Sequence, residues 1–242
     1  MTTGSRLTTA AALVGAALLA GCASGPPANP ADPFEQYNRS MSTFNDHLDK
    51  AVLKPVATAY RDVTPSPLRT GVNNFFSNLG DAWSFVNNVL QWRGRAAFDS
   101  LVRFGTNTVF GLGGVLDIAS EARIERHRQD FGQTLGRWGL ASGPYLVLPL
   151  LGPSTVRDTV ALPVDMWYGD PLQAVQDRGA RNSLYALRFV ARREQLLGAS
   201  SVLDAAALDP YSFTRDVYLR LRAAPVDSVD DGGDDGKLPD DY

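Results

Sequence analysis

Apolar residues recur along residues 72–90 at alternating steps of four and three, which predicts a long amphipathic helix. The stripe consists of Val72, Phe76, Leu79, Trp83, Val86 and Leu90. This spacing places the side chains on one face of an α-helix. Other apolar residues widen that face: Phe75, Phe85, Val89 and Trp92. A face wider than a two-helix contact needs indicates that part of it meets lipid or lines a channel.

The pattern along the rest of the chain predicts further helices, separated by helix breakers. Asp32 is a suitable N-cap with Pro33 behind it, and Pro55 is expected to break or kink the first helix after Lys54. The sequence TPSP at 64–67 then separates the first helix from the long one. Besides the long helix, we expect helices at about 32–54, 95–110, 172–197 and 211–222.

The remaining segments contain short interruptions but no convincing sheet. Glycines interrupt the pattern in GLGG at 111–114, and GPYLVLPLLGPS at 143–154 contains the longest apolar run after the N-terminal leader. That run, Tyr145–Leu151, is far too short to cross a bilayer. No internal repeat and no alternating strand pattern longer than five residues is found. The expected fold is therefore a single, mostly α domain over residues 32–222.

Polar residues interrupt the apolar helices in an unusual way. They are Asn73, Asn74, Asn78, Asn87, Asn88, Arg103 and Asn107. Asparagine is a poor helix former, and a buried amide must find hydrogen-bond partners. Two interpretations are open. These residues form caps, interhelical hydrogen bonds and solvent faces, or they line an amphipathic path with apolar groups toward acyl chains and polar groups toward head groups or water.

The single cysteine, Cys22, follows a short leader. Residues 1–9 carry Arg6 and no acidic residue, and residues 10–20 are an uncharged apolar run of the length found in secretory leaders. The tetrapeptide Leu-Ala-Gly-Cys at 19–22 resembles the bacterial lipobox, which implies cleavage before Cys22 and its acylation. Several acyl chains anchor a protein stably. We therefore expect a signal peptide at 1–21 and a lipidated tether at 22–31.

Charge is distributed unevenly along the chain. The formal net charge is −3, but the last 20 residues contain seven aspartates and one lysine. This composition predicts a disordered acidic tail at 223–242. The twenty arginines and three lysines are scattered along the chain. No nucleic-acid-binding signature is present.

Candidate catalytic chemistry is sparse. Only His47 and His127 could serve a histidine-dependent triad, and neither a G-x-S-x-G nor an H-E-x-x-H motif occurs. We interpret His47 as a surface or interface residue, and His127 as part of a solvated loop or helix end. No catalytic residue, metal site or cofactor is expected, and the protein is predicted not to be an enzyme.

The glycine-rich segment at 110–117 is the best candidate for a moving part. Three glycines between apolar helices cost helix stability and permit large backbone changes. We predict a channel or gate region formed by Asn107, Phe110, Gly111, Gly113, Gly114, Val115 and Leu116. An ordinary turn is the alternative.

Several sequence blocks together resemble the MlaA (VacJ) lipoproteins of the Gram-negative outer membrane. The most specific is DFGQTLGRWGLASGPYLVLPLLGPSTVRD at 130–158. The others are DPFEQYNR at 32–39, FNDHLDKAVLKPVATAY at 44–60, GVNNFFSNL at 71–79, RFGTNTVFGLGGVLDIA at 103–119 and DPYSFTRDVY at 209–218.

The chain departs from the family pattern at three places. Proline is usual where Asp81-Ala82 stands, an acidic residue is usual at Gln129, and Gly is frequent at Ala161. These departures concern local helix geometry.

The resemblance implies a ring of amphipathic helices lying in the inner leaflet of the outer membrane around a lipid channel. The protein would be lipid-anchored at the periplasmic face. It would remove phospholipids from the outer leaflet and pass them to a soluble periplasmic carrier of the MlaC type. Porin trimers in the outer membrane are its implied companions.

Two other functional classes remain open at this stage. The first is an adaptor lipoprotein that contacts porins without moving lipid. The second is a membrane-bound lipid hydrolase that uses a serine. Intact phospholipid that co-purifies with the protein would favour transport, and released fatty acid would favour hydrolysis.

Overall fold

The computed structural model describes residues 32–223, and this part of the chain is mostly helical. The predicted signal peptide at 1–21, the predicted tether at 22–31 with Cys22, and the predicted tail at 223–242 lie outside it, except for Ala223 at the end of the last helix. The elements in chain order are α2 (Glu35–Leu48), η1 (Asp49–Leu53), α3 (Lys54–Val63), α4 (Ser66–Leu90), α5 (Gly94–Val109), α6 (Ile118–Glu121), α7 (Phe131–Arg137), β1 (Tyr145–Leu148), β2 (Gly152–Thr155), α8 (Val156–Trp167), η2 (Pro171–Ala174), α9 (Arg178–Gln195), α10 (Leu197–Ala206) and α11 (Pro210–Ala223).

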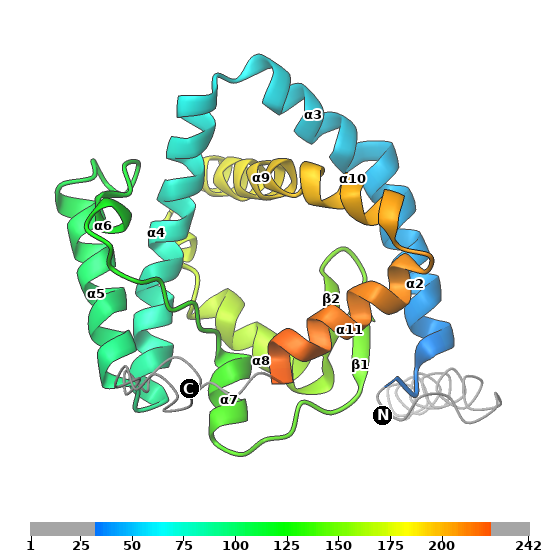
Figure 1. Cartoon of the computed structure of the whole chain (residues 1–242). Coiled ribbons are helices and arrows are strands. Elements are labelled where there is room, and N and C mark those ends of the chain that lie inside the picture. Colours follow the sequence, from blue (N-terminus) through cyan, green and yellow to red (C-terminus); the bar gives the residue numbers. More distant parts are fainter. Residues whose placement is uncertain (1–31, 224–242) are drawn as a thin grey trace, which may run out of the picture.

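The helices are arranged as a ring (Figure 1). The path runs from α2 through α3 to α4, and α5 packs along the outside of α4. Helices α7 and α8 and the β1–β2 hairpin form the opposite part of the ring, and α11 returns to the start of α2. Helix α9 packs against both α3 and α4. The architecture thus confirms the predicted single, mostly α fold.

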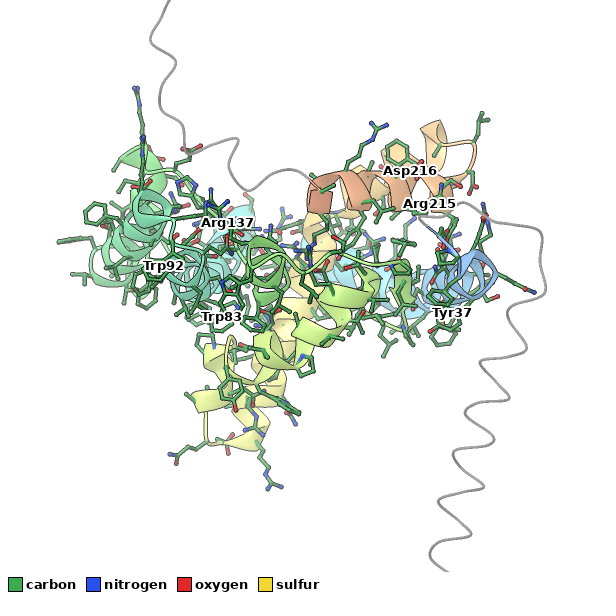
Figure 2. The ribbon with its side chains drawn as sticks, turned by 90° about the horizontal axis from the view of Figure 1, so that it is seen from below. Tyr37, Trp83, Trp92, Arg137, Arg215 and Asp216 are labelled. Carbon is green, nitrogen blue, oxygen red and sulfur yellow. The ribbon has the colours of Figure 1, made fainter. Side chains whose placement is uncertain are left out.

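Seen along its edge, the ring is a layer with parts projecting from it (Figure 2). Trp92 lies at the α5 side of this layer and Tyr37 at the α2 side. The segment around η2 and the start of α9 projects from one side, and α11 lies on the other. No helix in the described part of the chain is both long enough and apolar enough to cross a bilayer.

Helices α4 and α5 pack against each other, and most of the side chains that they bury are polar. The buried side chains of α4 include Asn78, Asp81, Asn87 and Asn88, and those of α5 include Arg103. Some of these polar groups pair across the interface: Asn88 Nδ2 donates to Ser100 Oγ at 3.2 Å, and Asn78 Nδ2 donates to Thr108 Oγ1 at 2.9 Å. The first interpretation of the polar residues therefore holds for these positions.

The apolar residues of the same helices point outward. Trp92 is 91% exposed, and Phe98, Val109 and Phe110 are between 65% and 71% exposed. The wide apolar face predicted from the sequence therefore covers no protein core at these positions.

The ring is closed by contacts between the first and last helices. Asn38 donates to Asp32 Oδ1 at 2.8 Å and to the carbonyl of Tyr145 at 3.0 Å, and its amide oxygen accepts from Val147 N at 2.8 Å. The carboxylate of Asp32 also accepts from Tyr211 Oη and, at 3.2 Å, from Arg215. Asn38 thus joins α2 to a strand more than 100 residues away, and Asp32 joins the start of the ring to α11, more than 170 residues away.

Two expectations for the first helix were wrong. Asp32 does not cap it, because α2 begins after Phe34 without a side-chain cap and Asp32 is fully buried in the ring closure. Pro55 does not end the helical path either. A π-helical turn, η1, precedes it, so Pro55 lies in the first turn of α3, where no backbone N–H is required.

Other elements differ from the sequence prediction further along the chain. The apolar run at 145–151 contributes β1, which pairs antiparallel with β2, so the chain contains a hairpin. Helix α8 and the short α6 and α7 were not predicted, and residues 197–206, expected to separate helices, form α10. Helix α4 is continuous through Asp81, so the missing proline leaves it unbroken.

Candidate functional site

A cavity of about 1020 Å³ opens beside α4 inside the ring. Its walls come from α4, the loop that precedes α7, the end of α8, η2 and α9. A cavity of this size can hold a large part of a lipid-sized ligand.

Apolar side chains form much of the cavity wall. They are Phe76 and Trp83 from α4, Leu151 from the hairpin, Met166 from α8, and Tyr185 and Phe189 from α9. Phe76 and Trp83 belong to the stripe identified in the sequence. Part of that stripe therefore lines a cavity, as its width predicted.

Trp83 is fixed in this wall by a buried carboxylate. Its indole Nε1 donates to Asp165 Oδ1 at 2.7 Å, and the backbone N–H of Phe131 donates to the same oxygen at 2.8 Å. Burial raises the pKa of Asp165, and these two hydrogen bonds partly offset the effect. The contact joins α4 to α8 and to the start of α7.

Five charged residues also line the cavity. Asp170 pairs with Arg188 at 2.7 Å, and Asp130 pairs with Arg222 of α11 at 2.6 Å. The other two, Arg128 and Arg192, pair with no carboxylate of residues 32–223. Two positive charges of the wall are therefore not neutralised by the described protein.

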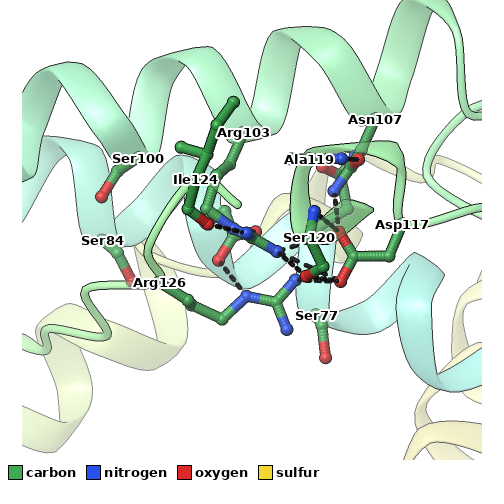
Figure 3. Close-up of polar contacts among 12 residues, drawn as sticks. Ser77, Ser84, Ser100, Arg103, Asn107, Asp117, Ala119, Ser120, Ile124 and Arg126 are labelled. Atoms are coloured by element: carbon green, nitrogen blue, oxygen red, sulfur yellow. Dashed lines mark hydrogen bonds and ion pairs between the residues drawn. The ribbon is translucent and has the colours of Figure 1, made fainter. Parts of the chain in front are cut away.

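A buried ion cluster holds the loop at 122–130 against α4 and α5 (Figure 3). Arg103, 1% exposed, donates to both carboxylate oxygens of Asp117, at 2.9 and 3.1 Å, and also to the carbonyl oxygen of Ile124. Arg126 Nε lies 3.1 Å from an oxygen of Asp81, and its Nη2 lies 3.3 Å from Asp117. Arg128 lies in the same loop as Arg126, so the ion cluster also fixes the position of Arg128 at the cavity wall.

The two carboxylates of this cluster are shifted in opposite directions. Burial raises the pKa of Asp81, and the charges of Arg126 and Arg103 only partly offset it. For Asp117, burial also acts to raise the pKa, but hydrogen bonds from Ser120 and Asn107 outweigh it and hold the pKa below its usual range.

None of the residues predicted as a gate lines the large cavity. Asn107 is buried, donates to Asp117 at 3.0 Å and accepts from Ala119 N at 2.9 Å, so its amide serves the ion cluster. Cys22 lies outside the described residues.

The glycines of the predicted gate occupy positions that a residue with a Cβ could take only with strain or a clash. Gly113 and Gly114 adopt φ angles of +74° and +95°. A Cβ at Gly111 would lie 2.2 Å from the carbonyl oxygen of Leu116, and one at Gly114 would lie 2.6 Å from Asn78 Nδ2. The apolar neighbours Phe110, Val115 and Leu116 are exposed. The segment is a tight loop with an apolar surface.

The two histidines differ from each other. His47 is exposed on α2, as predicted. The prediction of a solvated His127 was wrong: its side chain is 7% exposed and its Nε2 lies 3.1 Å from Asp99 Oδ2.

Arg128 and Arg192 line the cavity but were not predicted from the sequence as site residues. Arg128 stands in the charged segment EARIERHRQD, and Arg192 stands in ARRE on α9. In the sequence, nothing distinguishes either arginine from the other charged residues of its segment. Their approach to one cavity depends on how the loop and α9 pack.

Comparison with known proteins gives a consistent result. Residues 30–225 match the family described as "MlaA lipoprotein". The chain is 35% identical to the Escherichia coli K12 "Intermembrane phospholipid transport system lipoprotein MlaA", with 95% of the chain and 91% of the relative covered. The relative of the same name from Haemophilus influenzae is 34% identical, with 86% and 85% covered. A solved structure reported as "Structural basis for maintenance of bacterial outer membrane lipid asymmetry" superposes with a TM-score of 0.68 at 35% identity, covering 79% of the chain and 96% of that structure.

Proposed function

The chain belongs to the MlaA lipoprotein family, and from that premise we propose that it moves phospholipids out of the outer leaflet of the outer membrane. It passes them to a soluble periplasmic carrier and so maintains the lipid asymmetry of that membrane. Lipid crosses the ring through the cavity beside α4. The proposal requires no bond to be made or broken, so the protein works without catalytic residues.

The observation that carries this proposal is the amphipathic cavity inside a ring with an apolar exterior. An acyl chain that lies against Phe76, Trp83 and Phe189 is removed from water, which is favourable. The arginines and side-chain amides of the same wall can donate hydrogen bonds to a head group. An adaptor would need the ring's outer surface but no cavity of about 1020 Å³.

We place the ring in one leaflet, anchored by acylated Cys22 at the periplasmic face of the outer membrane. Support comes from the exposed apolar side chains of the α4–α5 pair, with Trp92 at its end. Large exposed apolar surfaces mark contacts with membranes or partners. We propose porin trimers and an MlaC-type carrier as partners, on the strength of the family resemblance.

The loop at 110–117 remains our candidate for a gate. It joins α5 to the ion cluster through Asp117, and its glycines allow backbone changes that other residues resist. Because it does not line the cavity, it would act from outside, by shifting α5 and the loop at 122–130.

A glycine in the cavity wall offers a direct test of the lipid path. Gly80 lines the cavity, and a Cβ there would meet nothing within 4 Å. In Gly80→Phe, the ring of the new side chain occupies the cavity without a clash at Cβ. We expect cells with this variant to expose phospholipid in the outer leaflet as cells without the gene do.

Gly105→Phe is the matched control, because Gly105 is also a mid-helix glycine with no atom within 4 Å of its Cβ, but it does not line the cavity. Cells that produce Gly105→Phe at the same level as Gly80→Phe should keep the normal lipid asymmetry of the outer membrane. Normal asymmetry in well-expressed Gly80→Phe would contradict transport through this cavity. Protein purified without phospholipid would favour an adaptor, and fatty acid release would favour a hydrolase.

A further inference from the structure

Arg128 and Arg192 approach one cavity from different parts of the fold. Arg128 belongs to the loop that the ion cluster holds against α4, and Arg192 belongs to the last turns of α9. Both line the cavity and keep solvent-accessible surface, although the protein around Arg128 removes part of its water. They are close enough for the charge of Arg192 to act on Arg128.

Neither arginine forms a direct ion pair with a carboxylate of residues 32–223. Of the two carboxylates in the wall, Asp170 is held by Arg188 and Asp130 by Arg222. Within residues 32–223, the Arg128 side chain makes one hydrogen bond, to Ser77 Oγ at 3.3 Å. Burial, and then the neighbouring charges of Arg126 and Arg192, lower the pKa of Arg128, and the charge of Asp81 only partly offsets them. Positive charge is therefore concentrated beside an apolar wall.

We propose that Arg128 and Arg192 bind the phosphate of the transported lipid while its acyl chains lie against the apolar wall. This inference rests on the proposed function and specifies its substrate as a lipid with a phosphate ester. The guanidinium group suits this task because it presents several N–H donors in a plane and keeps its charge. Ser77 accepts from Arg128, so its own hydroxyl hydrogen is available to a phosphate oxygen.

The two arginines lie near aromatic side chains of the cavity wall along the chain. Phe76 and Trp83 lie on the same helix as Ser77, and Phe189 lies one turn before Arg192 on α9. A phosphate held between the arginines therefore places the glycerol and tails beside these aromatic side chains. The recognised chemistry is the phosphate itself, whether it belongs to a lipid or to a free ion, so an experiment must separate these sources.

The experiment measures binding of two lipids to the full-length lipoprotein purified in detergent. The probes are phosphatidylglycerol and diacylglycerol with the same chains and the same fluorophore on one chain. We expect the wild type to prefer phosphatidylglycerol. The preference should fall about tenfold or more in Arg128→Gln/Arg192→Gln, while diacylglycerol binding changes little. Arg128→Lys/Arg192→Lys should restore part of the preference.

The matched control is Arg178→Gln, which removes an exposed arginine of α9 that does not line the cavity. It should keep the wild-type preference. Undiminished preference in the double Gln variant would overturn this inference and leave the proposed function standing. Failure of the wild type to bind either lipid would overturn both.

Two further measurements on the wild type need no variant. Raising the salt concentration from about 0.1 M to about 1 M should weaken phosphatidylglycerol binding and spare diacylglycerol, since salt screens accessible charges. Inorganic phosphate at equal concentration should displace the phospholipid poorly, because it gains nothing from the apolar wall. Salt-independent binding would overturn the inference, and equally effective displacement by inorganic phosphate would overturn its lipid part.

Discussion

At the scale of single residues, the molecule is held together by buried polar groups more than by large apolar ones. Of the large apolar side chains that are fully or nearly buried, Tyr145 and Tyr211 both lie in the ring closure, where Tyr211 donates to Asp32. The α4–α5 interface instead buries amides, Arg103 and Asp81. A buried charge is tolerated only where its partners are complete.

Replacing Arg103 by glutamine should therefore destabilise the protein strongly. The substitution leaves the buried Asp81 and Asp117 without a main partner, which typically costs about 3–5 kcal/mol. Arg95→Gln changes an exposed arginine of the same helix and should alter the free energy of unfolding by less than about 0.5 kcal/mol. Denaturant titrations followed by circular dichroism in detergent measure both. Equal stability of the two variants would contradict a supporting role for the ion cluster.

Asp117 should contribute a specific dependence of stability on acid. Its pKa is lower in the folded protein than its ordinary value of 3.8, so the folded state binds fewer protons than the unfolded state. The stabilisation is complete above the ordinary pKa and is lost as the pH falls below it. Asp117→Asn should cost about 2 kcal/mol at neutral pH and should lose less stability than the wild type between about pH 5 and pH 2.

Asp81 provides an internal check on that comparison. Burial raises its pKa, so its protonation in acid favours the folded state, opposite in sign to the effect of Asp117. Because the two carboxylates share Arg103 and Arg126, the difference between the two acid titrations reports Asp117 together with its effect on Asp81. Parallel titration curves would show that Asp117 is not stabilised by its partners.

At the scale of elements, the loop at 110–117 and the loop at 122–130 are coupled through one cluster. Asp117 ends the first loop and caps α6, while Ile124 and Arg126 lie in the second. A backbone change in the glycine segment can therefore reach the loop that carries Arg128. This coupling gives the predicted gate a physical route to the cavity.

Gly113→Ala tests whether mobility of the glycine segment matters. Gly113 has φ +74° and open space around its Cβ, so alanine introduces backbone strain of about 1 kcal/mol without a clash. Gly139, with φ +96° and the same open space, lies after α7 and is the matched control. Stability should fall equally in both variants, but only Gly113→Ala should slow lipid transfer to the carrier, by severalfold. Equal transfer rates would mean that the segment is an ordinary turn.

At the scale of the whole molecule, the apolar and polar sides of the α4–α5 pair are arranged opposite to those of a water-soluble bundle. Its polar residues pair inside, and Phe98, Val109 and Trp92 face outward. This arrangement is stable where the outside is lipid, because apolar side chains then remain out of water.

We therefore expect the mature Cys22→Ala protein, which lacks its acyl chains, still to partition into phospholipid vesicles. Phe98 is 65% exposed, and adding Phe98→Gln should weaken partitioning by about 2 kcal/mol, or roughly 30-fold. Leu221→Gln, at a side chain 69% exposed on α11, is the matched control and should leave partitioning near the Cys22→Ala value. A monodisperse Cys22→Ala protein that binds neither vesicles nor detergent would contradict embedding in a leaflet.

The sequence by itself determined where the main helices lie. The period of α4, the breakers TPSP and GLGG, and the start of α5 are local properties, and each was located closely. The width of the apolar face also belongs to one element, so it could be recognised before its surroundings were known. The resemblance to the family likewise depends on local sequence blocks.

Only the tertiary structure decided which face of each helix is inside. Periodicity separates an apolar face of a helix from a polar one, but it does not show whether either face contacts protein, lipid or water. The buried face of α4 could therefore be the polar one. Asp32 was mistaken for a cap because its partners Tyr211 and Arg215 lie about 180 residues away. Arg128 and Arg192 share a cavity because Arg103 and Arg126 fix a loop against α4. Such contacts depend on distances between elements, about which the pattern within an element carries no information.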